Sequence, residues 1–276
     1  MRFGHFRDAM SASQCPSSLS LRVLALRKHF NDVVLPLWRG PGFNAALSLP
    51  YESLDVVGGQ PWPAQRYRAM ACARQLYVYS CASDSGSAQH AERLFGALQQ
   101  FFQNRSHQGW RYSVDALGEP LDERQDLYTH AFIVYACAAY FRRSQHSMAR
   151  RLMLQTAEGI ESRFKRSDGL YNAVLSADWR YSAGPIQNHM MHLTEAYLAA
   201  AHVAEPAWFG SRLRELAQVM MQTFVHPRVH TITEAALGSQ GNAIEPGHQF
   251  EWFSLVSGAP EVFEGLELRR YLPRAL

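Results

Sequence analysis

The stretch DLYTHAFIVYACAAYFRR, residues 126–143, decides the fold class. Its apolar run from Ala131 to Phe141 is 11 residues long, which is too short to span a bilayer. A helix that is apolar nearly all round is buried in a protein core, whereas a helix with one charged face lies at the periphery. Residues 148–164 are of the second kind. The two segments together predict a helical hairpin with a buried first helix.

The same pairing of a buried and a peripheral helix recurs along the chain. Residues 63–83 and 88–103 form an earlier pair, and residues 188–204 and 208–224 form a later one. Polar connections that contain Gly and aromatic residues separate the pairs, at 109–123, 168–185 and 227–246. A repeated helical hairpin predicts an all-α fold, a toroid of the α/α-barrel type, with the site among the loops at one rim.

The ends of the chain differ from this repeat. Residues 1–16 carry no periodic pattern, and we expect them to be disordered. From residue 17 the apolar spacing predicts a helix that ends near residue 37. Residues 40–62 predict a long irregular connection with one short strand. We expect residues 17–276 to form a single domain.

Three histidines stand near the starts of apolar helical stretches. They are His130 in DLYTHAF, His192 in NHMMHLTEA and His248 in EPGHQFEW. Aligned on these motifs, they suggest that one end of each repeat faces a common polar pocket. Each of them could instead be a buried residue that is hydrogen-bonded to a backbone carbonyl, and the sequence leaves this alternative open.

Composition limits the partners of this chain. It has 276 residues, of which 47% are hydrophobic, and its net charge of +3 is spread out, so we expect no nucleic-acid partner. The N-terminus lacks the apolar block of a signal peptide, and we expect no membrane partner. The four cysteines contain no CxxC pair and predict a reduced, cytoplasmic setting with neither a disulfide framework nor a metal site.

The motifs resemble those of the N-acylglucosamine 2-epimerase and mannose isomerase family. The resemblance rests on Ala73-Arg74-Gln75 with Tyr77, on DLYTHAF, on NHMMHLTEA and on PGHQFEW, in that order, and covers residues 19–255. It implies an (α/α)6 barrel that interconverts sugars without a cofactor, by moving a proton next to an opened carbonyl.

The resemblance also implies roles for particular residues. Those counted as catalytic are Arg74, His192, Glu195, His248 and Glu251. Those expected to bind a monosaccharide substrate are Tyr128, His130, Asn188 and Trp252. His248 would be one of two acid/base histidines, Arg74 would contact the sugar oxygens, and the two glutamates would support the histidines.

The chemistry of the proposed reaction suits these residue types. A proton next to a carbonyl needs a base with a pKa near the operating pH, and histidine has an ordinary pKa of about 6.5. The enediolate oxygens need a positive group, which Arg74 can supply. Glu195 and Glu251 each follow a histidine by three residues, a spacing that shares one helix face. The predicted reaction is therefore aldose–ketose isomerisation or C2 epimerisation through an enediolate.

The chain departs from the family at its C-terminal end. The sequence ends 28 residues after His248, where the family continues with two further hairpins and its second acid/base histidine. This departure predicts an incomplete barrel, self-association into a homodimer through the open edge, and isomerisation rather than epimerisation. It also leaves open that catalytic activity is lost.

Three alternatives remain at the level of sequence. The first is an incomplete family member that only binds sugar. The second is a glycoside hydrolase that uses Glu195 and Glu251 as its carboxylate pair. The third is a divalent-metal isomerase with His130, His192, His248 and a glutamate as ligands.

Overall fold

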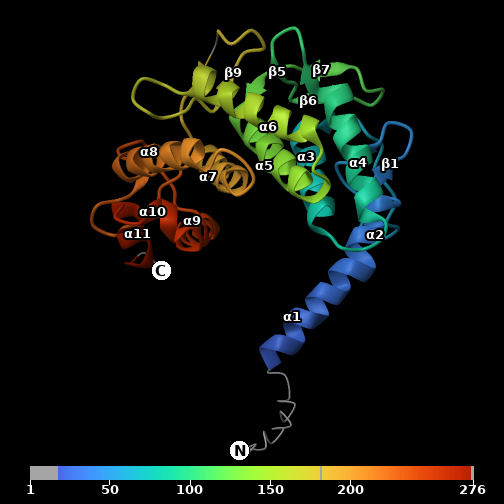
Figure 1. The fold of residues 1–276 in the computed structure, drawn as a ribbon, viewed down its shortest axis with the longest axis horizontal. Coiled ribbons are helices and arrows are strands. Elements are labelled where there is room, and N and C mark those ends of the chain that lie inside the picture. The colour runs from blue at the N-terminus through green and yellow to red at the C-terminus, as the bar shows by residue number, and fades with distance from the viewer. Residues whose placement is uncertain (1–17, 181, 275–276) are drawn as a thin grey trace, which may run out of the picture.

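The computed structural model describes residues 18–180 and 182–274, and most of them are helical (Figure 1). The expectation that residues 1–16 are disordered lies outside the described residues. The first helical segment comprises α1 (Ser18–His29), the π-helical η1 (Phe30–Val34) and α2 (Leu35–Arg39). It ends at the Gly40-Pro41-Gly42 turn, close to the predicted end at residue 37.

The three predicted hairpins are present. The first consists of α3 (Ala69–Cys81), α4 (Ser87–Ala97) and the π-helical η2 (Leu98–Phe102). The second consists of α5 (Leu127–Ser144), α6 (Ser147–Gly159) and the π-helical η3 (Ile160–Phe164). The third consists of α7 (Gln187–Ala201) and α8 (Pro206–Phe224).

The first helix of each hairpin is the inner one, as predicted. Helix α5 contacts both α3 and α7, and each of these also contacts the outer helix of its own hairpin. Helix α5 is preceded by its N-cap residue Asp126, whose side chain accepts a 2.7 Å hydrogen bond from the backbone N–H of Thr129. Burial of the stretch from Ala131 to Tyr140, in which only Tyr135 is partly exposed, makes α5 the centre of the core.

Short antiparallel strands lie in the connections. The segment 40–62 forms two strands, β1 (Phe43–Asn44) and β2 (Leu49–Pro50), one more than predicted. In the connection between the first two hairpins, β6 (Ser113–Asp115) pairs with β7 (Pro120–Asp122) and β4 (Gln103–Asn104) pairs with β5 (Gly109–Trp110). Strand β6 also pairs with β3 (Arg66–Arg68), which precedes α3. Strand β9 (Val174–Leu175) lies between β8 (Gln125–Asp126) and β10 (Ser182–Ala183).

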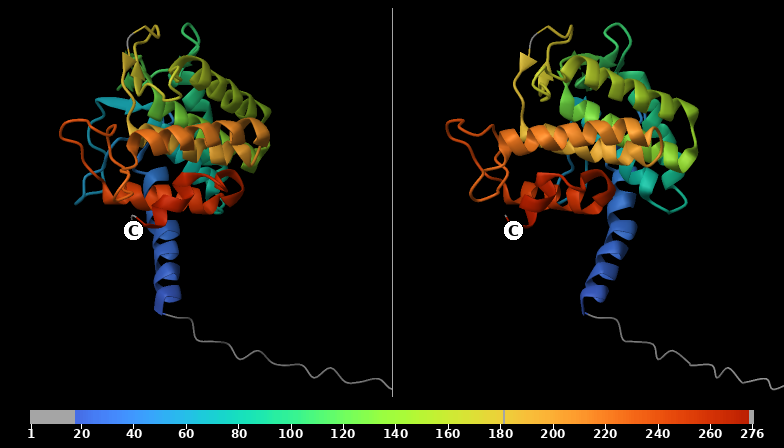
Figure 2. Two further views of the ribbon diagram at one scale, coloured as in Figure 1. Left: turned by 90° about the vertical axis from the view of Figure 1, so that its left-hand side faces the viewer. Right: turned by 60° about the vertical axis from the view of Figure 1, so that its left-hand side comes forward.

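The chain after α8 continues the arc of helices. Helix α9 (Pro246–Gly258) contacts α7, and the short α10 (Pro260–Phe263), α11 (Glu267–Tyr271) and 3-10 turn η4 (Leu272–Arg274) follow. Figure 1 shows an arc that is open between α1 and α9–α11, and Figure 2 shows α1 extending away from the helical layers. Among the helices in the described part of the chain, none has the length and apolar character needed to cross a membrane.

Candidate active site

Arg74 and Tyr128 connect the first two inner helices. The guanidinium of Arg74 on α3 donates a 2.9 Å hydrogen bond from Nη2 to the Tyr128 hydroxyl on α5. Its Cζ also lies 4.5 Å from the ring centroid of Phe132. Tyr128 and Phe132 are four residues apart and therefore share one face of α5. Arg74 is itself exposed, so its remaining N–H groups are free to meet a ligand's oxygens.

His192 on α7 lies against the same aromatic face. Its ring centroid is 4.6 Å from that of Tyr128 and 5.0 Å from that of Phe132. Its Nδ1 is 3.1 Å from Oε2 of Glu195, the carboxylate predicted to support it. When Nδ1–H donates to this carboxylate, Nε2 keeps its lone pair and can accept a proton.

His248 is held by a carboxylate that the sequence analysis missed. Its Nδ1 is 2.8 Å from Oε1 of Glu234, in the loop before α9, rather than paired with Glu251. Nε2 of Gln187 lies 2.8 Å from the same His248 Nδ1 and donates to the Glu234 oxygen at 2.9 Å, while its Oε1 accepts a 2.8 Å hydrogen bond from Nε1 of Trp252. Since Trp252 can only donate, it fixes the orientation of the Gln187 amide. This corrects the prediction that Glu251 supports His248.

Glu251 nevertheless has an electrostatic effect on Tyr128, the hydrogen-bond partner of Arg74. Burial raises the pKa of the Tyr128 hydroxyl, the charge of Arg74 opposes the rise, and the carboxylates of Glu251 and Glu195 add to it. Glu251 is exposed on α9, three residues after His248. Its charge therefore reaches the Tyr128 side of the helices and remains available to a ligand.

His130 does not join the other two histidines. It is the fourth residue of α5, whereas His192 is the sixth of α7 and His248 the third of α9, so the three occupy different helical phases. It follows Tyr128 by two residues, which places it on the opposite side of α5. Its Nδ1–H donates 2.8 Å to the Asp126 carbonyl, and full burial lowers its pKa to about 4. The predicted convergence of three imidazoles is wrong for His130.

Trp252 is also placed away from a ligand. Its side chain is fully buried, and its indole N–H is used by Gln187. The buried positions of Trp252 and His130 do not favour the expected direct contact of these two side chains with the sugar. Trp252 instead anchors the hydrogen bonds that hold His248.

Asn188 and its neighbour His189 bring further polar atoms to the start of α7. Among the described residues, neither Asn188 Oδ1 nor His189 Nδ1 has a hydrogen-bond partner, although both atoms are buried. Nε2 of His189 lies 3.5 Å from Oδ1 of Asp126, and its ring packs edge-on to Tyr128 at 5.6 Å. Burial raises the pKa of Asp126, but bonds from His189 and Thr129 outweigh it and leave the pKa lowered. His189 lies inside the NHMMH motif and was missed as a site residue.

A groove in the described structure lies elsewhere. It has a volume of about 640 Å³ and is lined by the β4–β5 region, α6, η3 and Trp179, with His130 among its residues. Arg74, Tyr128, His192 and His248 do not line it. Arg74, Tyr128 and His192 instead contact one another between the inner helices α3, α5 and α7, and His248 is linked to α7 through Gln187. We take these residues as the candidate active site. Within residues 18–180 and 182–274, no group of three or more His, Cys, Asp or Glu side chains could hold a metal ion.

Helical hairpins with an inner polar cluster define an (α/α)6-barrel fold, and solved structures share it. The cellobiose 2-epimerase of Spirochaeta thermophila DSM 6192 superposes with a TM-score of 0.82 at 22% identity, covering 94% of this chain and 70% of that one. Residues 51–275 match the family model of N-acylglucosamine 2-epimerase (GlcNAc 2-epimerase). The chain belongs to this family of sugar epimerases and isomerases, which confirms the resemblance seen in the sequence.

Two curated relatives have related names. Mannose-6-phosphate isomerase of Rhizobium meliloti (strain 1021) is 29% identical over 245 residues, which are 80% of this chain and 59% of the relative. D-mannose isomerase of Thermobifida fusca is 26% identical over 231 residues, which are 79% of this chain and 55% of the relative. The chain thus spans less than two thirds of the length of these relatives.

Proposed function

We propose that this protein is an aldose–ketose isomerase or C2 epimerase of a monosaccharide of the mannose or N-acylglucosamine type. One observation supports it above the others. Two imidazoles, His192 and His248, each have Nδ1 beside a carboxylate, at 3.1 Å from Glu195 and 2.8 Å from Glu234. A carboxylate at Nδ1 leaves Nε2 as a base, and a protonated ring is stabilised by the same contact.

The proposed reaction begins at C2 of an open-chain sugar. A histidine Nε2 takes the C2 proton, the C2–H electron pair becomes the C1–C2 double bond, and the carbonyl electron pair moves to oxygen. Arg74, with Tyr128 as its hydrogen-bond partner, would stabilise the resulting enediolate oxygens. Transfer of the O2–H proton to O1 with protonation of C1 then gives a ketose, and protonation of C2 on its other face gives the epimer.

Of the two outcomes, we propose isomerisation first. Isomerisation needs a proton carrier on one face of the enediolate, whereas epimerisation needs groups on both faces. The two imidazoles come from α7 and α9, which are in contact with each other. Groups on adjacent helices approach a bound sugar from one side.

Hydrogen exchange in D2O tests the proposal. The protein is incubated with mannose, glucose, fructose and N-acetylglucosamine, and deuterium at C1 and C2 is followed by NMR. We expect deuterium at C2 of one aldose together with its ketose, and loss of this exchange in His192→Gln and His248→Gln. Glu264→Gln, at an exposed position directly after α10, is the matched control.

A helical, folded protein that exchanges no deuterium into any of the four sugars would contradict the proposal. If isothermal titration then showed sugar binding without exchange, the alternative of a non-catalytic sugar binder would replace it. Deuterium exchange and isothermal titration use the same protein sample. Circular dichroism of that sample shows first whether the protein is folded.

The glycoside hydrolase alternative has less support. The Glu195 carboxylate is hydrogen-bonded to His192. It also interacts with Tyr135, whose pKa is raised by burial, by the Tyr77 hydroxyl and by the charge of Glu195. Glu195 therefore already has two partners within the protein. Hydrolysis of a disaccharide that is lost in Glu251→Gln and kept in His248→Ala would reverse this ranking. The homodimer and the cytoplasmic location stay predictions.

A further inference from the structure

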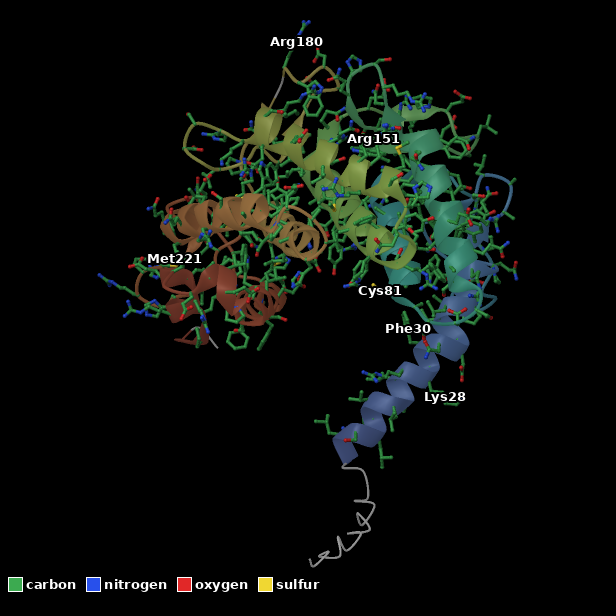
Figure 3. The ribbon with its side chains drawn as sticks, viewed as in Figure 1. Lys28, Phe30, Cys81, Arg151, Arg180 and Met221 are labelled. Carbon is green, nitrogen blue, oxygen red and sulfur yellow. The ribbon has the colours of Figure 1, made fainter. Side chains whose placement is uncertain are left out.

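The groove beside α6 carries polar groups that the candidate active site does not use. Its volume of about 640 Å³ is within the range of roughly 300–1,000 Å³ that is typical of small-molecule sites. Its lining comes from β4, β5 and the turn between them, from α6 and η3, and from Trp179 in the loop between β9 and β10. In Figure 3, Arg151 marks α6, and Arg180, the residue after Trp179, stands at the outer edge of the arc. The groove therefore lies on the outer side of the second hairpin, whereas Arg74 and Tyr128 meet between inner helices.

His130 supplies an unsatisfied hydrogen-bond acceptor at the floor of this groove. Its Nδ1–H donates to the Asp126 carbonyl at 2.8 Å, so Nε2 carries the lone pair of the neutral ring. The residue is 2% exposed, and among the described residues Nε2 has no hydrogen-bond partner. Buried polar atoms without a partner are uncommon and costly. A ligand that satisfies this atom must bring an O–H or N–H donor, and because the ring is covered, the donor would reach Nε2 through a bridging water.

The rim of the groove carries amides rather than a cluster of one charge. The side chains of Gln103, Gln108 and Gln155 line it, and an amide both donates and accepts hydrogen bonds. Two exposed charged side chains, Arg105 and Glu158, are of opposite sign, and among the described residues neither forms an ion pair. A lining of this kind suits a ligand without net charge, whose hydroxyl groups also donate and accept.

Arg163 belongs to the wall of the groove and is already engaged within the protein. Its Nη1 donates 2.8 Å to the His107 carbonyl, and its Nη2 donates 2.9 Å to Oε1 of Gln108. Its Cζ lies 4.4 Å from the ring centroid of Trp179, whose Nε1–H donates 2.9 Å to the same His107 carbonyl. Because both Nη groups are used, Arg163 shapes the wall and does not offer a free fork to a phosphate or carboxylate.

The backbone of the same wall adopts uncommon conformations. Trp179 has a φ of +68° and Gln108 a φ of +53°, values that residues other than glycine rarely adopt. A Cβ at Gly109 would lie 2.2 Å from Oε1 of Gln125 and 2.8 Å from Cζ2 of Trp179, so only glycine fits there. Strained backbone positions cluster at ligand-binding sites, where the surrounding structure holds them. The wall therefore has the features of a built site.

We propose that this groove is a second binding site, for an uncharged mono- or disaccharide, separate from the candidate active site. The sugar lies between the β4–β5 turn and α6, beside the partly exposed Trp179. Its hydroxyl groups pair with the amides of Gln103, Gln108 and Gln155, and one of them donates through a water to Nε2 of His130. This inference does not depend on the proposed function, because binding in the groove requires no proton transfer.

The indole N–H signals of isotope-labelled tryptophan test the site by NMR. The chain has six tryptophans, of which Trp110 and Trp179 line the groove and Trp208 on α8 does not. The probes are cellobiose, mannose and N-acetylglucosamine. We expect at least one of them to shift the signals of Trp110 and Trp179 in a saturable manner and to leave that of Trp208 in place. Glucuronate and glucose 6-phosphate should bind about 10-fold more weakly, because the groove has no unopposed free cation.

Two exposed side chains on α6 provide the test by substitution. Gln155→Ala/Glu158→Ala removes hydrogen-bonding groups from the rim, and we expect the dissociation constant of the sugar to rise about 10-fold. The matched control is Glu92→Ala/Gln100→Ala, at two exposed positions of the first hairpin that do not line the groove. This control should leave the dissociation constant unchanged.

His192→Gln/His248→Gln separates the groove from the candidate active site. We expect this variant to lose C2 exchange and to keep the sugar-induced shifts of the Trp110 and Trp179 signals. Shifts that disappear in this variant would mean that they come from the candidate active site, and they would overturn the proposal.

Three other results would overturn it as well. They are no saturable shift with any of the three neutral sugars, equal or tighter binding of the anionic sugars, and an unchanged dissociation constant in Gln155→Ala/Glu158→Ala. A wild-type protein that shows the shifts without C2 exchange would instead contradict the proposed function alone, so the two proposals fail separately.

Discussion

Nδ1 of His248 lies 2.8 Å from Oε1 of Glu234, a residue 14 positions earlier in an irregular loop. Gln187 from α7 donates to the same oxygen, and Trp252 holds Gln187 in place. Three segments far apart in the sequence thus fix the orientation of one imidazole. A proton carrier must be held in place, and this network fixes the position of the ring, with Gln187 Nε2 and Glu234 Oε1 each 2.8 Å from Nδ1.

Glu234→Gln tests the network directly. The neutral amide lacks the negative charge with which the carboxylate stabilises a protonated imidazole. We therefore expect the rate of C2 exchange to fall about 100-fold while KM changes little. The exchange assay in D2O and the unfolding midpoint in urea are measured together. Equal losses in Glu234→Gln and in the exposed control Glu267→Gln would speak against a specific role for Glu234.

Arg74→Lys separates charge from the guanidinium geometry. Lysine keeps the positive charge but cannot span Tyr128 and a sugar oxygen at once, and we expect a loss of exchange of about 100-fold. Because Arg74 is exposed, the free energy of unfolding should stay within about 0.5 kcal/mol of the wild-type value. Tyr128→Phe, which removes the hydroxyl but keeps the ring, should show a smaller loss of exchange.

Trp252→Phe tests the anchor of Gln187. The substitution leaves the amide oxygen of Gln187 buried without its donor, and we expect the free energy of unfolding to fall by about 1–3 kcal/mol. Chemical denaturation followed by circular dichroism measures the change. Trp62→Phe, at a side chain 60% exposed, is the control and should have no measurable effect.

His130 predicts a pH dependence of stability. Burial lowers the pKa of His130 to about 4, and burial also lowers the pKa of His90 to about 4, both below the ordinary value of 6.5. The unfolded chain then binds more protons between pH 6.5 and pH 4, so stability is full above pH 6.5 and is lost as the pH falls. For His130 we expect a loss of about 1.5 kcal/mol between pH 6.5 and pH 5.

Urea unfolding from pH 7.5 to pH 5 measures this dependence. His130→Asn should have a shallower pH slope than the wild type, even if its stability at pH 7.5 is lower. His29→Asn, at an exposed position on α1, should keep the wild-type slope. An unchanged slope in His130→Asn would mean that His130 is not the group that binds the proton on unfolding.

Much of the fold follows from the sequence. The apolar run Ala131–Phe141 predicted the buried α5, and the three hairpins end within a few residues of their predicted limits. These features are predictable because the spacing of apolar residues along the chain determines which segments are helical and which faces are buried. The motif matches predicted the family, and the structure brings their residues Arg74, Tyr128 and His192 into contact. These residues lie at the starts or on the inner faces of regular helices, where spacing along the chain determines the face.

The tertiary structure decided the partners of these residues. His130 lies on the opposite side of α5 from Tyr128, because two residues turn a helix by more than half a circle. An alignment of motifs does not show this difference in direction. Glu234 could not be predicted as the partner of His248, because an irregular loop has no period that determines where a side chain points. Local sequence determined which helices form and which faces are buried, whereas long-range packing determined which carboxylate meets which imidazole.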